Sequence, residues 1–385
     1  MRHGGVDAQP LPESDELTLE IGRKYTTGKE CYPSIITTGD FIKKTMQPDF
    51  DPRKAAFFMP AAAGPCRFGQ YNRLQRVILD EIGLQEVPIL VFDQTGGYHN
   101  DLSNMGNGFR INAWRGFIIL DSLQKLLHER RPYEVNSGQV DEVYRDYLER
   151  LIQNIGQDNE TLRKLSHEAR AAFDAVKIDR SSPRPRIGIV GEIFVRSNHF
   201  ANEGLVEKLE RLGAQVGVPP VEEWFDYIDH QREFRYRKRL EGNWRDWAKQ
   251  KLTEIVMERT VEPLRKEFDS GIELFRREAD TADIIARGRR YIVPAVEGEA
   301  ILSMGRVVEY AEHGFDGIVN IIPFGCMPGT IVSLLLHQFR QDFGLPILNV
   351  VTDGTRNPGQ ELRLDAFVQQ CAEHMRQRKS GTKTH

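Results

Sequence analysis

Apolar residues along the chain alternate between short continuous runs and helical spacing, and this pattern recurs in two regions. In the first region, residues 54 to 60 predict a short buried strand. Apolar residues between 68 and 82 then recur at every third or fourth position, as in a helix that Gly83 ends. Residues 87 to 92 predict the next strand. Strands that alternate with helices in this way indicate a parallel sheet.

The second region begins at Arg186. Residues 187 to 190 predict a buried strand that ends at Gly191-Glu192, and an apolar strand at 317 to 323 is followed by a helix at 330 to 343. A further strand is expected at 347 to 351 and a last helix near 360 to 377. This region therefore predicts a second parallel sheet covered by helices.

Breaks in these patterns predict the domain boundaries. Ser and Pro cluster at 181 to 185 between two periodic segments, which is typical of a linker. We therefore expect an α/β fold of two Rossmann-like domains with parallel sheets and helical insertions. The expected ranges are a disordered leader at 1–18, a first α/β domain with a helical segment at 19–180, and a second α/β domain at 186–377 that contains a charged helical insertion at 222–288.

Composition narrows the function classes. The chain has 385 residues, 40% of them hydrophobic and 28% charged, with a net charge of -4, which disfavours a general nucleic-acid binder. No apolar run approaches the roughly 18 residues of a membrane span, and the first residues lack the apolar core of a signal peptide. Neither a G-x-G-x-x-G nor a G-x-x-x-x-G-K-[ST] pattern follows a strand, so NAD and ATP sites are disfavoured. These features predict a cytoplasmic protein without a membrane or nucleic-acid partner.

Three of the four cysteines lie beside glycine or proline at predicted helix starts. Cys66 and Cys326 each follow a predicted strand and precede a helix, and Cys31 precedes a helix that begins near Pro33. Ligands bind at the carboxyl ends of parallel strands, and a helix N-terminus favours the thiolate that binds metals. The spacing lacks a C-x-x-C pair, so it fits neither a zinc ribbon nor a ferredoxin. A shared metal site and inert core thiols both remain open from spacing alone, and Cys371 is expected to be a core residue.

Five segments together resemble the 2-hydroxyacyl-CoA dehydratase and benzoyl-CoA reductase superfamily. They are the three cysteine segments Gly28–Pro33, Gly64–Gly69 and Pro323–Gly329, with Gly191–Arg196 and Val296–Ala300. Within the superfamily the chain is most similar to the activase-related subfamily, whose members are described as CoA-substrate-specific enzyme activase or 2-hydroxyglutaryl-CoA dehydratase-like. The resemblance covers roughly residues 20 to 370, and an ATPase module that accompanies this region in many members has no counterpart in the sequence.

The resemblance implies a [4Fe–4S] cluster in the cleft between two Rossmann-like domains. Cys31, Cys66 and Cys326 match its three ligands, and one iron is left open. It also implies an ATP-dependent activator with its own iron–sulfur cluster, which supplies low-potential electrons for the reduction or reductive dehydration of a CoA-linked or similar substrate. A linked double-cubane cluster occurs in another branch of the superfamily. The chain would act in an anaerobic setting, as a homo- or hetero-oligomer.

Five other positions hold candidate site residues, and a structural or surface role is the alternative for the first two. Glu192 after a strand end and His199 in a polar loop are candidate catalytic proton carriers, whereas a capping carboxylate and a surface histidine are the alternatives. Glu297 and Glu299 bracket Gly298, and one of them is expected to face the cleft. Arg67 is a candidate donor to the cluster or to an anion.

Two further alternatives concern a basic segment and the function itself. Residues 231 to 251 are basic and aromatic, which suits a solvated helical face, a docking face for the activator or a contact with CoA phosphates better than a nucleic-acid surface. The alternatives to a reductase are a cluster-carrying electron-transfer or scaffold protein without its own substrate, and a metal-free binding module.

Overall fold

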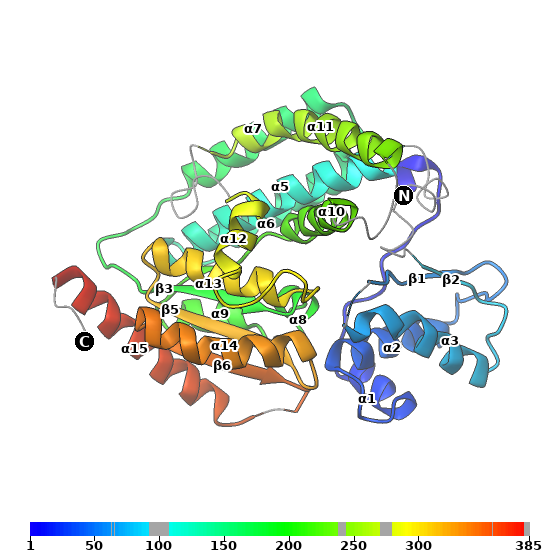
Figure 1. Ribbon diagram of the computed structural model, residues 1–385. Coiled ribbons are helices and arrows are strands. Elements are labelled where there is room, and N and C mark those ends of the chain that lie inside the picture. The colour runs from blue at the N-terminus through cyan, green and yellow to red at the C-terminus, as the bar shows by residue number, and fades with distance from the viewer. Residues whose placement is uncertain are drawn as a thin grey trace.

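The computed structural model describes residues 1–62, 64, 66–91, 108–237, 244–269, 279–355 and 357–380. It confirms the predicted α/β class: two parallel sheets are flanked by helices. Figure 1 shows three parts, which we call the N-terminal unit (residues 16–90), the sheet unit built on the larger sheet, and the helical layer that lies over it. None of the described helices is both long enough and apolar enough to cross a membrane.

The sheet unit contains four parallel strands in the order β4-β3-β5-β6. They are β3 (Arg186–Gly191), β4 (Gln215–Gly217), β5 (Gly317–Pro323) and β6 (Ile347–Thr352). The two central strands are rich in Val and Ile and are almost wholly buried, because helices cover both faces of the sheet. Residues of β3 alternate between these faces: Ile187 and Ile189 pack on one side and Val190 on the other.

Helices α9 (Leu205–Arg211) and α15 (Gln360–Ser380) cover one face of this sheet. The other face is covered by α12 (Thr281–Gly288), α13 (Ala300–Glu312) and α14 (Met327–Phe343). Cys371 on α15 is fully buried in the first of these layers, against Gly317 at the start of β5. The structure therefore places Cys371 in the core, as expected from its sequence context.

The order of the strands creates a crevice between β3 and β5. The chain runs from β3 to β4 on one side of the crevice and from β5 to β6 on the other, so the two connections diverge at the carboxyl ends of β3 and β5. Ligands bind at such a point in open α/β sheets. Gly191 at the end of β3 has φ +123°, and a Cβ there would lie 1.9 Å from the carbonyl oxygen of Ile321. Glycine is therefore required for β3 and β5 to approach at the point where Glu192 and Cys326 emerge.

The helical layer combines segments that are far apart in the sequence. It contains α5 (Phe109–Arg130), α6 (Gln139–Asn154), α7 (Asn159–Ala175), α10 (Glu222–Arg237) and α11 (Trp244–Lys266). Leu264 and Phe268 at the end of α11 are buried in one core with residues of α5, α6 and α7. The carboxylate of Asp121 on α5 accepts the backbone N–H groups of Val221 and Glu222 at the start of α10.

The N-terminal unit is built from short elements around its own small core. They are α1 (Glu16–Tyr25), α2 (Tyr32–Thr45), β1 (Phe57–Phe58), a 3-10 turn η2 (Arg67–Gln70), α3 (Tyr71–Glu81) and β2 (Ile89–Leu90). Its sheet contains only the parallel pair β1 and β2. The range expected to be a leader, 1–18, contains a turn at Arg2–Gly4 and the start of α1, and His3 packs against Gly156.

The structure does not confirm a division into two Rossmann-like domains. The predicted strands at 54 to 60 and 87 to 92 form only two pairs of residues, whereas the second sheet contains the strands expected at 187 to 190, 317 to 323 and 347 to 351. The helical segment of the first predicted domain shares a core with the end of the predicted insertion at 222–288. Periodicity predicts which face of a helix is buried but not the partner that covers it, so this interleaving was not predictable from the pattern.

Candidate functional site

Each of the three predicted ligand cysteines lies directly before a helical turn. Cys31 is the N-cap residue of α2, Cys66 that of η2, and Cys326 that of α14. Cys31 and Cys326 are buried, and Cys66 is half-buried. The backbone N–H of Gly329 donates to the Sγ atom of Cys326 at 3.4 Å, whereas the sulfur atoms of Cys31 and Cys66 make no such capping hydrogen bond. All three sulfur atoms lie at the start of a helical turn, and that of Cys326 meets a backbone donor there.

Arg67 joins the three cysteine loops. It directly follows Cys66, and its guanidinium donates to the carbonyl oxygen of Lys29 at 2.7 Å and to that of Gly325. Lys29 and Gly325 lie in the loops of Cys31 and Cys326, respectively. Gly325 has φ +74°, and a Cβ at this position would lie 2.6 Å from the guanidinium. One side chain from the Cys66 loop therefore holds the loops of the other two cysteines beside it.

The thiols lie close enough for each to affect the pKa of the next. Burial raises the pKa of Cys66 to about 11 and that of Cys326 to about 12, and it also raises the pKa of Cys31. Charge on Cys31 adds to the shift of Cys66, and charge on Cys66 adds to that of Cys326. From the sequence we expected the helix N-termini to lower the cysteine pKa values and so favour the thiolates. In the structure, burial has the larger effect and raises these pKa values. A bound metal ion reverses this balance, because a coordinating thiol is deprotonated.

Tyr71 is a functional candidate that the sequence pattern did not reveal. Its hydroxyl is hydrogen-bonded to the Sγ atom of Cys31 in a buried position, and burial raises its pKa further above the usual range. A neutral phenol donates a hydrogen bond to any thiolate that forms at Cys31. In the sequence Tyr71 was one of several apolar residues on the stripe of a helix. Spacing alone contains no signal that its hydroxyl meets a cysteine 40 positions away.

Glu192 lies at the end of β3, and both of its carboxylate oxygens have partners. They accept the backbone N–H groups of Phe194 and Val195 at 3.1 and 2.8 Å, so Glu192 caps the short helix α8 (Ile193–Ser197). Burial raises the pKa of Glu192 in spite of these two donors. The residue faces the cavity described below, but the structure gives it the capping role that was its alternative in the sequence.

Glu299 is the carboxylate that faces this site without a full set of partners. It lies directly before α13, and the backbone N–H of Ile193 hydrogen-bonds to its carboxylate. Its Oε1 atom is buried and has no hydrogen-bond partner. Burial, with the nearby charge of Glu192, raises the pKa of Glu299 well above its usual range. Burial of this kind favours the neutral, protonated form of a carboxyl group, which is the form that can donate a proton.

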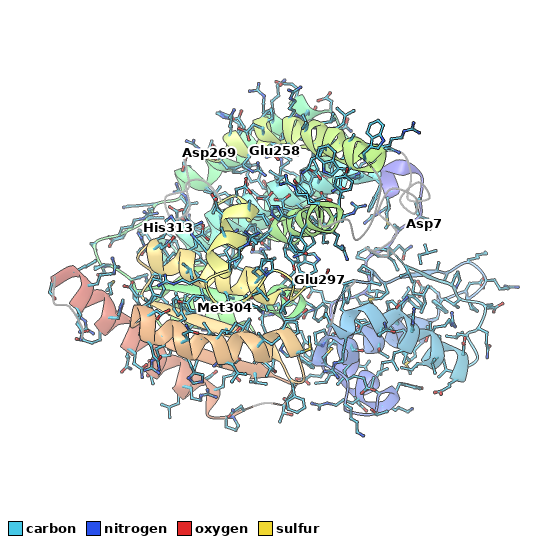
Figure 2. The ribbon with its side chains drawn as sticks, viewed as in Figure 1. Asp7, Glu258, Asp269, Glu297, Met304 and His313 are labelled. Carbon is cyan, nitrogen blue, oxygen red and sulfur yellow. The ribbon has the colours of Figure 1, made fainter. Side chains whose placement is uncertain are left out.

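The neighbouring candidates lie elsewhere. Glu297 points toward the N-terminal unit, close to Gly64, and forms an ion pair with Arg235 at 3.5 Å (Figure 2). The side chain of His199 is 78% exposed and its Nε2 atom faces Glu207 at 3.7 Å. His199 is not part of the cavity wall, so the structure does not bring this predicted proton carrier to the cysteines.

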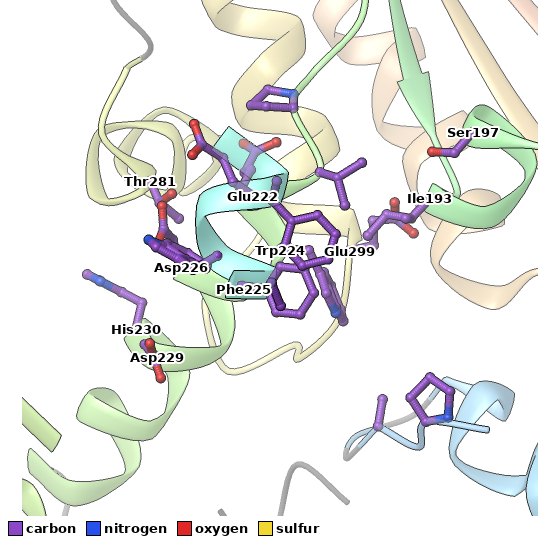
Figure 3. Close-up of a pocket in the computed structure, with 18 of the residues that line it drawn as sticks. Ile193, Ser197, Glu222, Trp224, Phe225, Asp226, Asp229, His230, Thr281 and Glu299 are labelled. Atoms are coloured by element: carbon purple, nitrogen blue, oxygen red, sulfur yellow. The ribbon is translucent and has the colours of Figure 1, made fainter. Parts of the chain in front are cut away.

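A cavity of about 1860 Å³ opens from the cysteines. Cys66, Cys326 and Glu299 line one end of it, and the rest of the wall comes from the helical layer together with the N-terminal unit and the sheet unit. Figure 3 shows Ile193 and Glu299 on one side, Trp224 and Phe225 in the middle, and Asp226, Asp229 and His230 on the opposite side. The cavity therefore leads from the helical layer to the crevice at the ends of β3 and β5.

The chemistry of the three cysteines is compatible with a cluster. Among the described residues, no group of three or more His, Cys, Asp or Glu side chains is close enough to bind one ion. Cysteines that bind a [4Fe–4S] cluster each bind a different iron atom, so their sulfur atoms lie farther apart than ligands of one ion. Two buried cysteines and one half-buried cysteine from three loops, with the Gly329 N–H and the Tyr71 hydroxyl beside two of them, fit such a group.

Parts of the remaining candidate segments lie outside the described residues. These parts are Gln94–Gly97, which follows the strand expected at 87 to 92, and residues 238–243 of the basic segment 231–251. In the described part of the basic segment, Tyr236 stacks on Trp247 with ring centroids 5.6 Å apart. Asp353 and Gly354 pack against α1 instead: the carbonyl of Asp353 accepts from Arg23 at 2.9 Å.

Comparison with protein-family models and with curated proteins finds no match for this chain.

Proposed function

We propose that this protein is an iron–sulfur reductase or dehydratase component that accepts low-potential electrons from an ATP-dependent activator. In this proposal Cys31, Cys66 and Cys326 bind a [4Fe–4S] cluster. The observation that carries it is the presence of three cysteines at three helix starts, joined by Arg67, at the end of a large cavity. The segments that resemble the 2-hydroxyacyl-CoA dehydratase superfamily include all three cysteines and Glu299.

The protein's own side chains have distinct roles in this proposal. When bound, the cluster supplies single electrons at low potential to a molecule in the cavity. Tyr71 donates to the sulfur of Cys31 and the backbone N–H of Gly329 to that of Cys326, and both stabilise negative charge on these atoms. Each electron that reaches the substrate requires a compensating proton, and Glu299, whose burial favours its protonated form, is the proposed donor beside Cys66 and Cys326. The aromatic wall of the cavity limits the access of water.

The cavity favours an enzyme over the alternative of an electron-transfer or scaffold protein. A protein that only carries a cluster requires no space for a substrate beside it. Here Cys66 and Cys326 line a cavity large enough for a small molecule, and Glu299 faces it with a buried, unpartnered oxygen. A cytoplasmic, anaerobic location is part of the proposal, because reduced thiols and exposed iron persist there.

The cysteine assignment can be tested by anaerobic purification of two matched variants. Cys66→Ala should lose the cluster because one of its three protein ligands is gone. Cys371→Ala should retain it, since Cys371 is buried in the core on α15. Iron, sulfide and the visible absorption of each variant are compared with those of the unchanged protein. Equal iron content in the two variants would refute the assignment.

A further inference from the structure

The wall of the cavity beyond the cysteines is aromatic. Trp114 and Phe117 on α5 contact Phe225 on α10, with ring centroids 6.1 and 4.7 Å apart, and Trp224 also lines the cavity. The Nε1 atom of Trp114 is buried and has no hydrogen-bond partner. Rings that pack on one another in this way form a fixed apolar surface for a flat or compact molecule.

Past these rings the wall becomes acidic. Asp226 on α10 points into the cavity (Figure 3) and has no hydrogen bond or ion pair with the described part of the chain. Burial and the nearby charges of Glu222 and Asp229 raise the pKa of Asp226 to about 8. Glu258 of α11 adds to this shift, and Figure 2 shows it on the same helical layer. A positive group at this place would compensate several carboxylates together.

The basic residues of the wall already face carboxylates. Of the described lining residues, thirteen are Asp or Glu and five are Lys or Arg. Arg265 pairs with Glu222 and Glu258 at 3.1 and 2.7 Å. The remaining four basic residues face acidic groups in the same way: Lys251 with Glu233 and Glu254, Arg306 with Glu223 and Glu309, Lys266 with Glu262, and Arg110 beside Asp229 and Glu254.

This charge distribution disfavours a CoA thioester. The phosphate groups of CoA carry several negative charges, which require unpaired Lys or Arg side chains or free helix N-termini. On the described wall they would meet excess carboxylates instead, and juxtaposed like charges cost several kcal/mol. A molecule with a positive group would be attracted to these carboxylates, whereas the CoA phosphates would be repelled by them.

The geometry points to a compact protonated amine with an aromatic or apolar body as the ligand of this cavity. The body lies against Phe117, Trp224 and Phe225, and the ammonium group lies at Asp226. The opposite end of the molecule points toward Cys66, Cys326 and Glu299. The inference rests on the proposed function only for the statement that this end is the part to be reduced.

A matched series of probes tests the inference by isothermal titration calorimetry on the anaerobically purified full chain. The probes are 2-phenylethylamine, 2-phenylethanol, 3-phenylpropionate and coenzyme A, which separate the aromatic body from its charge. We expect 2-phenylethylamine to bind at least tenfold more tightly than 3-phenylpropionate, with 2-phenylethanol between them, and no heat from coenzyme A. Binding of coenzyme A or of the acid as tightly as the amine would overturn the inference.

Two variants locate the charge. Asp226→Asn should weaken binding of 2-phenylethylamine about tenfold and leave 2-phenylethanol unchanged, because the amide cannot ionise beside the ammonium group. Asp146→Asn, an exposed change on α6 outside the cavity, should alter neither. Equal amine affinity in both variants would also overturn the inference. Iron is measured in the same samples. Iron-free protein that binds the amine would refute the proposed function but not this inference. Iron-loaded protein that binds coenzyme A would refute this inference but not the proposed function.

Discussion

At the scale of single residues, the site contains two buried pairs in which one member changes the chemistry of the other. The Tyr71 hydroxyl is hydrogen-bonded to the sulfur of Cys31, and the charge of Glu192 adds to the burial that raises the pKa of Glu299. In each pair the partners come from segments that are far apart in the sequence. Removal of one hydroxyl or one carboxylate therefore tests a specific contact without removing a cysteine.

The Tyr71 hydrogen bond should raise the reduction potential of the proposed cluster. A donor to a ligand sulfur stabilises the reduced state, which carries more negative charge. Tyr71→Phe should therefore lower the potential by on the order of 60 mV, the equivalent of one charge-assisted hydrogen bond of about 1.5 kcal/mol. A redox titration followed by electron paramagnetic resonance measures it. Tyr147→Phe on α6 serves as the control, and equal potentials in the two variants would exclude this role for Tyr71.

At the scale of elements, the site depends on loops that have little regular structure of their own. The strands of the N-terminal unit are two residues long, so its cysteine loops are fixed by helix starts and by Arg67 rather than by a sheet. Arg67 contacts Lys29 within this unit, and its contact to Gly325 crosses to the loop after β5. In the helical layer, the buried carboxylate of Asp121 joins α5 to the start of α10.

Arg67→Gln removes the forked donor and keeps a polar side chain of moderate length. We expect the variant to bind iron but to release it to a chelator roughly tenfold faster, because the loops of Cys31 and Cys326 are no longer held beside Cys66. Absorbance during incubation with the chelator gives the rate. Arg53→Gln, in which an exposed arginine of the same unit is changed, should release iron at the original rate. An unchanged rate in Arg67→Gln would show that the guanidinium does not hold the loops.

Asp121→Ala should destabilise the packing of α10 on α5. The side chain of Asp121 is buried and accepts two backbone N–H groups, which would be left without an acceptor. The expected loss is about 1–3 kcal/mol in the free energy of unfolding, measured by urea denaturation. Asp146→Ala on the exposed face of α6 should change the stability by less than about 0.5 kcal/mol. Similar values for both variants would contradict the role assigned to Asp121.

At the scale of the whole molecule, the proposed cluster joins two units. Cys31 and Cys66 belong to the N-terminal unit and Cys326 to the sheet unit, and the cavity is lined by both units and by the helical layer. A group that binds all three cysteines stabilises their contact by its binding free energy. The packing of α1 and α2 on the sheet supplies a further contact that does not depend on the cysteines.

Removal of the metal should therefore loosen the N-terminal unit selectively. In hydrogen–deuterium exchange, backbone amides of α2 and α3 should exchange faster after chelation, whereas those of α6 and α7, which share a separate core, should not change. Equal protection of α2 and α3 before and after chelation would show that no bound group joins the two units.

The sequence predicted the parts of the site that depend on local pattern. Strand ends at Gly191 and Pro323, and helix starts at Cys31 and Cys326, follow from apolar runs and from proline positions. The contacts that complete the site are long-range. Nothing in the spacing distinguishes the capping role of Glu192 from the unpartnered oxygen of Glu299, because that difference depends on which N–H groups the fold brings near each.

The most direct test of the central claim is iron and sulfide analysis of the anaerobically purified chain. If Cys31, Cys66 and Cys326 bind one [4Fe–4S] cluster, the brown protein should contain about four iron and four sulfide ions per chain. Colourless protein that contains no iron and takes up none on reconstitution would contradict the account.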